Sequence, residues 1–190
     1  MEAPAIISRA RRPFLLPVWL TFATIFVAFV VVVIGFFVYR SSATTTVVVL
    51  ARHAEQEIGT IQDPPLSEEG EKRAQKLAQM FGHTNGVGHL DAIYVSDARR
   101  SQQTAAPLAE RLGKPVVVIP AADVKGTASR IMHEHSGGTV LVIGHVANVP
   151  ALIHELTDID VPPFASDEYD TLYVVSIPTF GHPNVLRMEY

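Results

Sequence analysis

One unbroken apolar segment near the N-terminus dominates the hydrophobic pattern of this chain. No charged residue occurs between Pro13 and Tyr39, and most positions there are Phe, Val, Ile, Leu or Ala. A membrane-spanning helix needs roughly 20 apolar residues at about 1.5 Å each, which this segment provides. Trp19 and Tyr39 lie near its two ends, where amphipathic rings favour the membrane interface. The pattern therefore predicts a transmembrane helix over residues 14–39, because so long a run exceeds what the core of a small domain uses.

This segment has two membrane interpretations, an uncleaved signal anchor and a cleaved signal peptide. A signal peptide usually has an apolar region of about 7–15 residues, so the greater length here favours the anchor. Small residues that would suit a cleavage site nevertheless follow the segment: Ser41, Ser42 and Ala43. A cleaved, secreted form of the protein therefore remains an alternative.

The flanking charges predict an orientation. Three arginines precede the segment, Arg9, Arg11 and Arg12, whereas only Arg40 follows it closely. The positive-inside rule then places residues 1–13 in the cytoplasm and the C-terminal part outside it, in the periplasm or at the cell surface.

After a short linker at residues 40–45, apolar β-branched runs alternate with amphipathic segments. The predicted strands cover residues 46–51, 91–95, 116–119, 139–143, 172–177 and 184–188. The predicted helices cover residues 67–81, 101–112, 126–135 and 149–156, with Ser67 as an N-cap and Gly113 as a C-cap. Strands that alternate with helices are typical of an α/β fold, and the last two strands look like an antiparallel edge. We predict a three-layer α/β/α sandwich with a mainly parallel sheet over residues 46–190.

Composition and charge exclude several classes of function. The chain has 190 residues, no cysteine and a formal net charge of −4. Without cysteine there is no disulfide scaffold, thiolate nucleophile or Cys₄ zinc site. The first 40 residues hold four of the 15 basic residues and one of the 19 acidic ones, so the predicted domain is more acidic than the whole chain. No large cationic field is available to attract nucleic acid.

Polar residues gather where three of the predicted strands end. The three runs are Arg52-His53-Ala54-Glu55, Ser96-Asp97-Ala98-Arg99-Arg100 and Gly144-His145-Val146-Ala147-Asn148. A single run of this kind is commonly a cap or a loop. Because sites in open α/β sheets form at the carboxyl ends of strands, three coincident runs predict a functional site there.

These runs, with two further motifs, carry a resemblance to a known family. The further motifs are Leu66-Ser67-Glu68-Glu69-Gly70 and the pair Thr104-Ala105 after Ser96-x-x-Arg99, and Pro150 follows the last run. In this order and spacing, residues 46–190 resemble the histidine phosphatase superfamily, with its phosphoglycerate-mutase-like fold, in its smaller branch.

The resemblance implies a mechanism in which His53 is the nucleophile and forms a phosphohistidine. Arg52 and Arg99 would clamp the phosphoryl oxygens with their planar guanidinium groups. His145 would complete the phosphate-binding pocket and stabilise charge on the phosphoryl oxygens. The resemblance implies no cofactor and no required metal, since cationic side chains take that role.

A general acid for an alkoxide leaving group is harder to identify. Asp123 is the favoured candidate because it follows the third strand near the carboxyl edge of the sheet. Its alternative role is the N-cap of the next helix, and the two interpretations weigh about equally. Glu134 and Glu55 are further candidates. Some phosphohistidine phosphatases of the family manage without an acid, because imidazole is a better leaving group.

Three departures from the family pattern bear on function. Ala54 stands where glycine is commoner, and Gly59 stands where mutases carry a phosphate-binding asparagine. Only about 45 residues separate Arg99 from His145, too few for a large cap. The Gly-x-Arg and His-Asp motifs of the acid-phosphatase and phytase branch are missing from the sequence. We therefore expect a phosphatase with an open pocket rather than a mutase or a phytase.

Two alternative functions remain, a non-catalytic phosphate-binding module and a phosphohistidine phosphatase that acts on a signalling protein. The expected partners are a phosphorylated small molecule or envelope component and, through residues 14–39, a membrane; nucleic acid is not expected. His133-Glu134-His135 does not predict a metal site, because alternate residues of a helix do not share a face.

Overall fold

The computed structural model describes residues 18–42, 44–59, 62–82 and 89–190. The chain divides into two compact units, Met1–Ser42 and Ala43–Tyr190. The predicted cytoplasmic segment 1–13 and Ala43 of the predicted linker lie outside the described residues.

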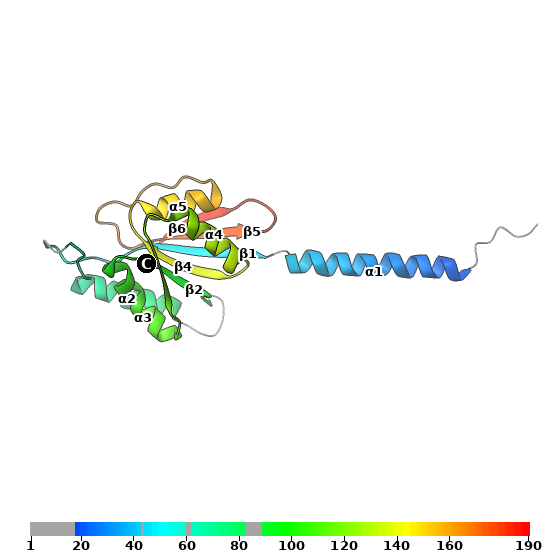
Figure 1. The fold of residues 1–190 in the computed structure, drawn as a ribbon, viewed down its shortest axis with the longest axis horizontal. Helices are drawn as coiled ribbons and strands as arrows, with labels where there is room; N and C mark the ends of the chain where they lie inside the picture. The colour runs from blue at the N-terminus through cyan, green and yellow to red at the C-terminus, as the bar shows by residue number, and fades with distance from the viewer. Residues whose placement is uncertain (1–17, 43, 60–61, 83–88) are drawn as a thin grey trace, which may run out of the picture. The chain divides into compact units, whose positions relative to one another are not determined.

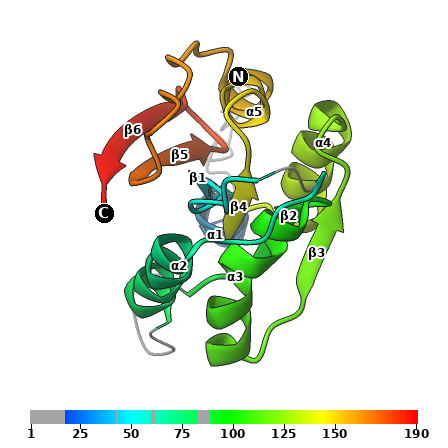
Figure 2. The ribbon, with the colours of Figure 1, turned by 90° about the vertical axis from the view of Figure 1, so that its left-hand side faces the viewer.

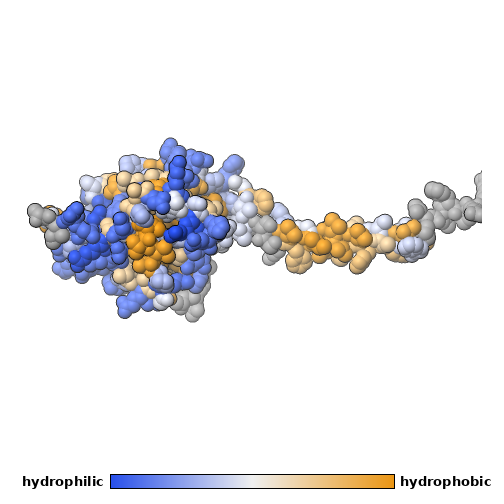
Figure 3. Space-filling view, viewed as in Figure 1, coloured by the Kyte–Doolittle hydropathy of each residue, from blue (hydrophilic) through white to orange (hydrophobic). Residues whose placement is uncertain are grey.

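The first unit contains one long helix, α1 (Val18–Ser42). Its segment Val18–Tyr39 has a mean hydropathy of 2.8 and is long and apolar enough to cross a membrane, a test that a signal sequence would also pass. Within the described residues the helix continues to Ser42, into the predicted linker (Figure 1), whereas residues 14–17 of the predicted span lie outside the described residues. Its large apolar side chains are exposed, and they form the orange surface of the helix in Figure 3.

The second unit is built on one sheet of six strands among the described residues. The strands are β1 (Thr45–Arg52), β2 (Ala92–Ser96), β3 (Val116–Ile119), β4 (Thr139–Gly144), β5 (Thr171–Pro178) and β6 (Asn184–Glu189). Their order is β3-β2-β4-β1-β5-β6 (Figure 2). The first four are parallel, whereas β5 pairs with β1, and β6 with β5, in the antiparallel direction. The sheet is therefore mixed, and the predicted antiparallel edge is present.

Four helices cover the two faces of this sheet. They are α2 (Glu68–Phe81), α3 (Arg99–Leu112), α4 (Val124–Glu134) and α5 (Asn148–Thr157). Figure 2 shows α2 and α3 together below the sheet and α4 and α5 together above it. Each pair packs over its own apolar cluster, one around Leu77 and Leu108 and the other around Ile131 and Ile153. The three layers of the predicted sandwich are confirmed.

Local sequence signals set the ends of α2 and α3. Ser67 has extended backbone angles, and its hydroxyl accepts the Gly70 N–H, as an N-cap does. Gly113 ends α3 in the left-handed conformation with φ of 61°, which glycine adopts without strain. Both predicted caps are confirmed.

The strand register brings three chain segments to one edge of the sheet. Arg52 at the end of β1 pairs with Gly144 at the end of β4, and Val95 of β2 pairs with Ile143. The next residue after β1, His53, donates its backbone N–H to Gly144 O at 2.9 Å. The polar runs that follow β1, β2 and β4 therefore meet, as predicted.

Candidate active site

His53 is held in one orientation at the end of β1. Its side chain is buried, with 5% of the residue exposed. Nδ1 lies 2.8 Å from Ala54 O; since a carbonyl only accepts, Nδ1 carries the proton in the neutral ring. Nε2 therefore presents a lone pair, and it accepts a hydrogen bond from Arg100 Nε at 3.1 Å. The Ala54 N–H donates to Thr104 Oγ1 at 3.0 Å, which ties this turn to α3.

His145 faces His53 from the end of β4. The two ring centroids are 5.1 Å apart, in an edge-to-face arrangement. The His145 backbone N–H donates to Asn148 Oδ1 at 2.6 Å, which fixes the turn into α5. His145 Nε2 lies 2.8 Å from Ser96 Oγ at the end of β2. The structure thus brings together the two predicted histidines.

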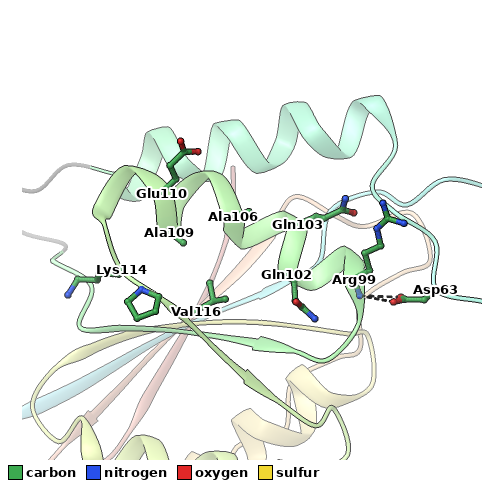
Figure 4. Close-up of a pocket in the computed structure, with 10 residues that line it drawn as sticks. Asp63, Arg99, Gln102, Gln103, Ala106, Ala109, Glu110, Lys114 and Val116 are labelled. Carbon is green, nitrogen blue, oxygen red and sulfur yellow. Dashed lines mark hydrogen bonds between the residues drawn. The ribbon is translucent and has the colours of Figure 1, made fainter.

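The arginine between the two rings is Arg100. Besides its bond to His53, Arg100 Nη2 lies 3.4 Å from His145 Nδ1, and Nη1 lies 3.6 Å from Asp63 Oδ1. Arg99, the predicted clamp, is exposed and lines a different pocket of about 710 Å³ along α3 (Figure 4). Its backbone N–H, not its guanidinium, contacts Asp63. The structure therefore places Arg100, and not Arg99, beside His53 and His145.

The phase of α3 explains this difference of one position. The helix turns Ser101, Thr104 and Ala105 inward, where they are buried. Arg100 precedes Thr104 by four residues and so lies on the same face, one turn away, whereas Arg99 points along the outer groove. The four-residue spacing from Arg100 to Thr104 is the sequence signal that could have identified the arginine that contacts the two histidines.

Arg52 is in the site, but it is engaged by a loop. Only 7% of the residue is exposed. Nη1 donates to three carbonyl oxygens of the loop between α5 and β5, those of Ala165 (2.9 Å), Ser166 (3.1 Å) and Glu168 (3.0 Å). The guanidinium carbon lies 3.9 Å from the centroid of the Tyr169 ring, which in turn faces His53 at 6.1 Å. Nε is buried and has no hydrogen-bond partner among the described residues. Sequence reasoning missed Tyr169, which no motif marks.

Burial and positive charge keep both imidazoles neutral near pH 7. Desolvation is the main cause that lowers the pKa of His53 to about 4; the bond to Ala54 opposes it, and the charge of Arg100 adds to it. Desolvation also lowers the pKa of His145, again with a contribution from Arg100. Burial is also the main cause that lowers the pKa of Arg52.

Among the described residues, none of the predicted acids contacts His53 or His145. Asp123 is the N-cap of α4: it is exposed, and its Oδ1 accepts the Gly126 N–H at 3.0 Å. The alternative prediction for this residue is therefore confirmed. Glu55 forms an ion pair with Arg73 at 2.6 Å, and these hydrogen bonds outweigh burial and lower the pKa of Glu55. Glu134 lies on α4 beside Tyr94 and Arg130.

Asp63, like Asp97, is a carboxylate whose charge opposes the lowering of the His145 pKa. It lies between Arg99 and Arg100 and is exposed. Among the described residues, no cluster of three or more histidine, aspartate or glutamate side chains is arranged to hold a metal ion. The chemistry that this site offers is therefore that of two neutral imidazoles with arginines around them.

Comparison with known proteins supports the resemblance drawn from the motifs. Residues 48–123 match the model of the histidine phosphatase superfamily (branch 1). A phosphoserine phosphatase 1 of Hydrogenobacter thermophilus is 41% identical over 75 residues, which cover 36% of this chain and 34% of that relative. The match thus spans about a third of the curated relative.

Solved structures of several phosphatases share the fold. The protein histidine phosphatase SixA complexed with tungstate is 21% identical, with a TM-score of 0.61 over 75% of this chain and 96% of its own. A phosphoserine phosphatase of Entamoeba histolytica complexed with 3-phosphoglyceric acid is 18% identical, with a TM-score of 0.56 over 76% and 97%. A mycobacterial glucosyl-3-phosphoglycerate phosphatase is 18% identical, with a TM-score of 0.58 over 70% and 90%.

Proposed function

Residues 48–123 of this chain belong to the histidine phosphatase superfamily, and from this premise we propose that the protein is a membrane-anchored phosphatase that hydrolyses phosphate monoesters through a phosphohistidine on His53. The observation that carries the proposal is the state of His53. Its Nε2 presents a lone pair beside Arg100, and burial holds its pKa at about 4. A buried, neutral imidazole flanked by guanidinium groups is suited to attack phosphorus in a bound phosphate.

In the first step, His53 Nε2 attacks phosphorus, and the bond from phosphorus to the ester oxygen breaks. For this attack, Arg100 must release its hydrogen bond to His53 Nε2, and it can then donate to the phosphoryl oxygens instead. Arg52 adds positive charge, and its unpartnered Nε is a further donor. These preplaced cations stabilise the charge spread over the phosphoryl oxygens in the transition state.

In the second step, water attacks phosphorus and the bond from phosphorus to Nε2 breaks, which returns the electron pair to His53. The product is inorganic phosphate. Splitting one transfer into two displacements is the usual benefit of covalent catalysis.

A second candidate function follows because, among the described residues, no carboxylate is hydrogen-bonded to either histidine ring. Asp123 caps a helix and Glu55 is paired with Arg73, so neither is free to protonate an alkoxide. A substrate whose leaving group needs no strong acid would suit this site. Phosphohistidine on a signalling protein has such a leaving group, and SixA is named a protein histidine phosphatase. This alternative requires a cytoplasmic domain.

The anchor is α1. Its apolar length and exposed apolar surface support an uncleaved signal anchor, with the C-terminal unit outside the cytoplasm. An alkaline-phosphatase fusion at the C-terminus tests this topology. An active fusion supports an extracytoplasmic domain and removes the signalling alternative; an inactive but well-expressed fusion contradicts the proposed orientation.

Activity of the full chain in mild detergent tests the chemistry. We expect hydrolysis of p-nitrophenyl phosphate in the presence of EDTA, and loss of it in His53→Ala. Rapid quenching with ³²P-labelled substrate should trap an acid-labile, base-stable phosphoprotein that His53→Ala does not form. An active His53→Ala protein would contradict the mechanism, and an intact wild-type protein with neither turnover nor trapped label would instead indicate a phosphate-binding module.

A further inference from the structure

Two buried serines form a hydrogen-bonded pair beside His145. Ser96 is the last residue of β2 and is 2% exposed, and Ser101 lies in the first turn of α3 and is fully buried. Ser96 Oγ donates to Ser101 Oγ at 2.7 Å, and it also lies 2.8 Å from His145 Nε2. The three polar atoms form a short chain that is closed off from solvent at the Ser101 end.

The direction of this chain determines where the His145 proton lies. A hydroxyl has a single proton, and Ser96 gives its proton to Ser101. Ser96 can then only accept from His145, so Nε2 carries the ring proton. Nδ1 is left with a lone pair, and the group that faces it is Arg100 Nη2, which can only donate. The contacts on the two sides of the ring agree on the same tautomer.

We propose that Ser96 is a positioning residue that fixes the tautomer of His145, with Ser101 setting the direction of the hydrogen bond. The catalytic part of this inference rests on the proposed function. In a neutral histidine, the hydrogen bond that one ring nitrogen makes determines which of the two nitrogens carries the proton. This control matters where one nitrogen must accept or donate a proton in the reaction.

The unprotonated Nδ1 of His145 can accept a proton in the second step. When water attacks the phosphohistidine, its oxygen bonds to phosphorus and the bond from phosphorus to His53 Nε2 breaks with its electron pair. One proton of the water moves to His145 Nδ1 and later leaves to solvent. Had the Ser96 hydroxyl donated to Nε2 instead, Nδ1 would already carry a proton and could not accept another.

Nitrogen NMR on the full chain tests the tautomer without any turnover. In ¹⁵N-labelled protein in mild detergent, long-range ¹⁵N–¹H spectra at pH 7 should show His145 with Nε2 protonated and Nδ1 bare, the signals being assigned by their loss in His145→Gln. In Ser101→Ala the Ser96 hydroxyl is free to turn toward Nε2, so a second tautomer should appear. A wild-type His145 with Nδ1 protonated would overturn the proposal, even if the protein proves to be an active phosphatase.

Kinetics then test the consequence. Ser96→Ala and Ser101→Ala should each lower kcat at least about tenfold, with KM within about twofold, because a catalytic histidine in the wrong tautomer is poorly active. Phosphohistidine should accumulate, since the second step is the one that slows. Ser96→Thr keeps the hydroxyl and should recover most of kcat.

Thr157→Ala is the matched control, because it removes another buried hydroxyl whose bond goes to Ile153 O within α5. It should lower stability without changing kcat. If Ser96→Ala does not fold, Ser101→Ala decides the question, because it leaves Ser96 in place. Unchanged kcat and an unchanged tautomer in Ser101→Ala would refute the role of the serine pair, whereas an inactive wild-type protein with the expected tautomer would refute the proposed function alone.

Discussion

Two adjacent arginines show how much depends on single positions in this site. Arg100 donates to His53 and approaches His145, whereas the Arg99 side chain lines the outer groove of α3 (Figure 4). Because the two residues share charge, size and helix, exchanging either for alanine gives a nearly matched pair of variants. Only one of them alters the surroundings of the nucleophile.

We predict that Arg100→Ala lowers kcat/KM at least about 100-fold, because preplaced donors to a charged transition state are each typically worth about that much. Arg99→Ala should stay within about threefold of wild type. Steady-state kinetics on p-nitrophenyl phosphate measure both values. Equal losses in the two variants would mean that the electrostatic field of the helix end, rather than the Arg100 contact, is what matters.

The lowered pKa of His53 predicts activity well into the acid range. The nucleophile must be neutral, and with a pKa of about 4 it stays neutral where an ordinary histidine would be mostly protonated. The acid limb of the rate of phosphohistidine formation should therefore fall near pH 4 rather than near pH 6.5. Quenched-flow measurements between pH 3.5 and 8 test this, and a midpoint near 6.5 would contradict it.

The lowered pKa of His53 also makes the stability of the folded chain depend on pH. The unfolded chain, with an ordinary histidine pKa, binds this proton more readily than the folded chain does. The free energy of unfolding should therefore fall as pH drops from about 6.5 toward 4. His53→Gln removes this contribution, so its stability should depend less on pH over that interval in urea titrations.

At the level of single residues, the sequence was informative where motif and strand end coincide. His53, His145 and Arg52 lie where those coincidences predict. The choice between Arg99 and Arg100 needed the phase of a helix whose first turn lies two residues before the predicted start. Tyr169 was beyond prediction, because it reaches the site from a loop that Arg52 holds through backbone carbonyls, which leave no trace in side-chain identity.

At the scale of elements, the first turn of α4 allows a test between two roles of Asp123, helix N-cap and general acid. Asp123 caps this helix, so Asp123→Ala should lower the free energy of unfolding by about 1 kcal/mol, the usual loss for such a cap. Asp123→Asn keeps a capping oxygen and should remain stable, and kcat on alkyl phosphates should change little in either variant. Selective slowing of esters with poor leaving groups in Asp123→Asn would restore Asp123 as the acid.

The elements themselves were largely predictable. Each predicted strand of the sheet is present to within one residue at either end, because buried β-branched runs have few other uses. Pairing direction was harder to predict, and the expected mainly parallel sheet is mixed. The antiparallel direction of β5 depends on the loop of residues 158–170 after α5, which returns the chain to the end of the sheet where the site lies.

For the whole molecule, α1 predicts that the protein stays in the membrane. The full chain should remain in the pellet after an alkaline carbonate wash, and Phe29→Arg with Val32→Arg should release it, because arginine at the centre of a spanning helix costs roughly 2.5–3.5 kcal/mol. Release of the wild-type chain, or a mass that shows loss of the first 40 or so residues, would point to cleavage instead.

The hydrogen bonds that hold the loop with Tyr169 have a consequence for how the protein loses activity on heating. Arg52 holds this loop to β1, and Glu168 holds it to the last strand through Arg187 at 2.7 Å, with Thr171 and the Ala165 N–H as further donors. These hydrogen bonds lower the pKa of Glu168 to about 2. Edge strands open more readily than central ones, and β6 lies at the edge of the sheet. Fraying of that strand would release one anchor of the loop, so catalysis should cease at a lower temperature than the one at which the central sheet melts.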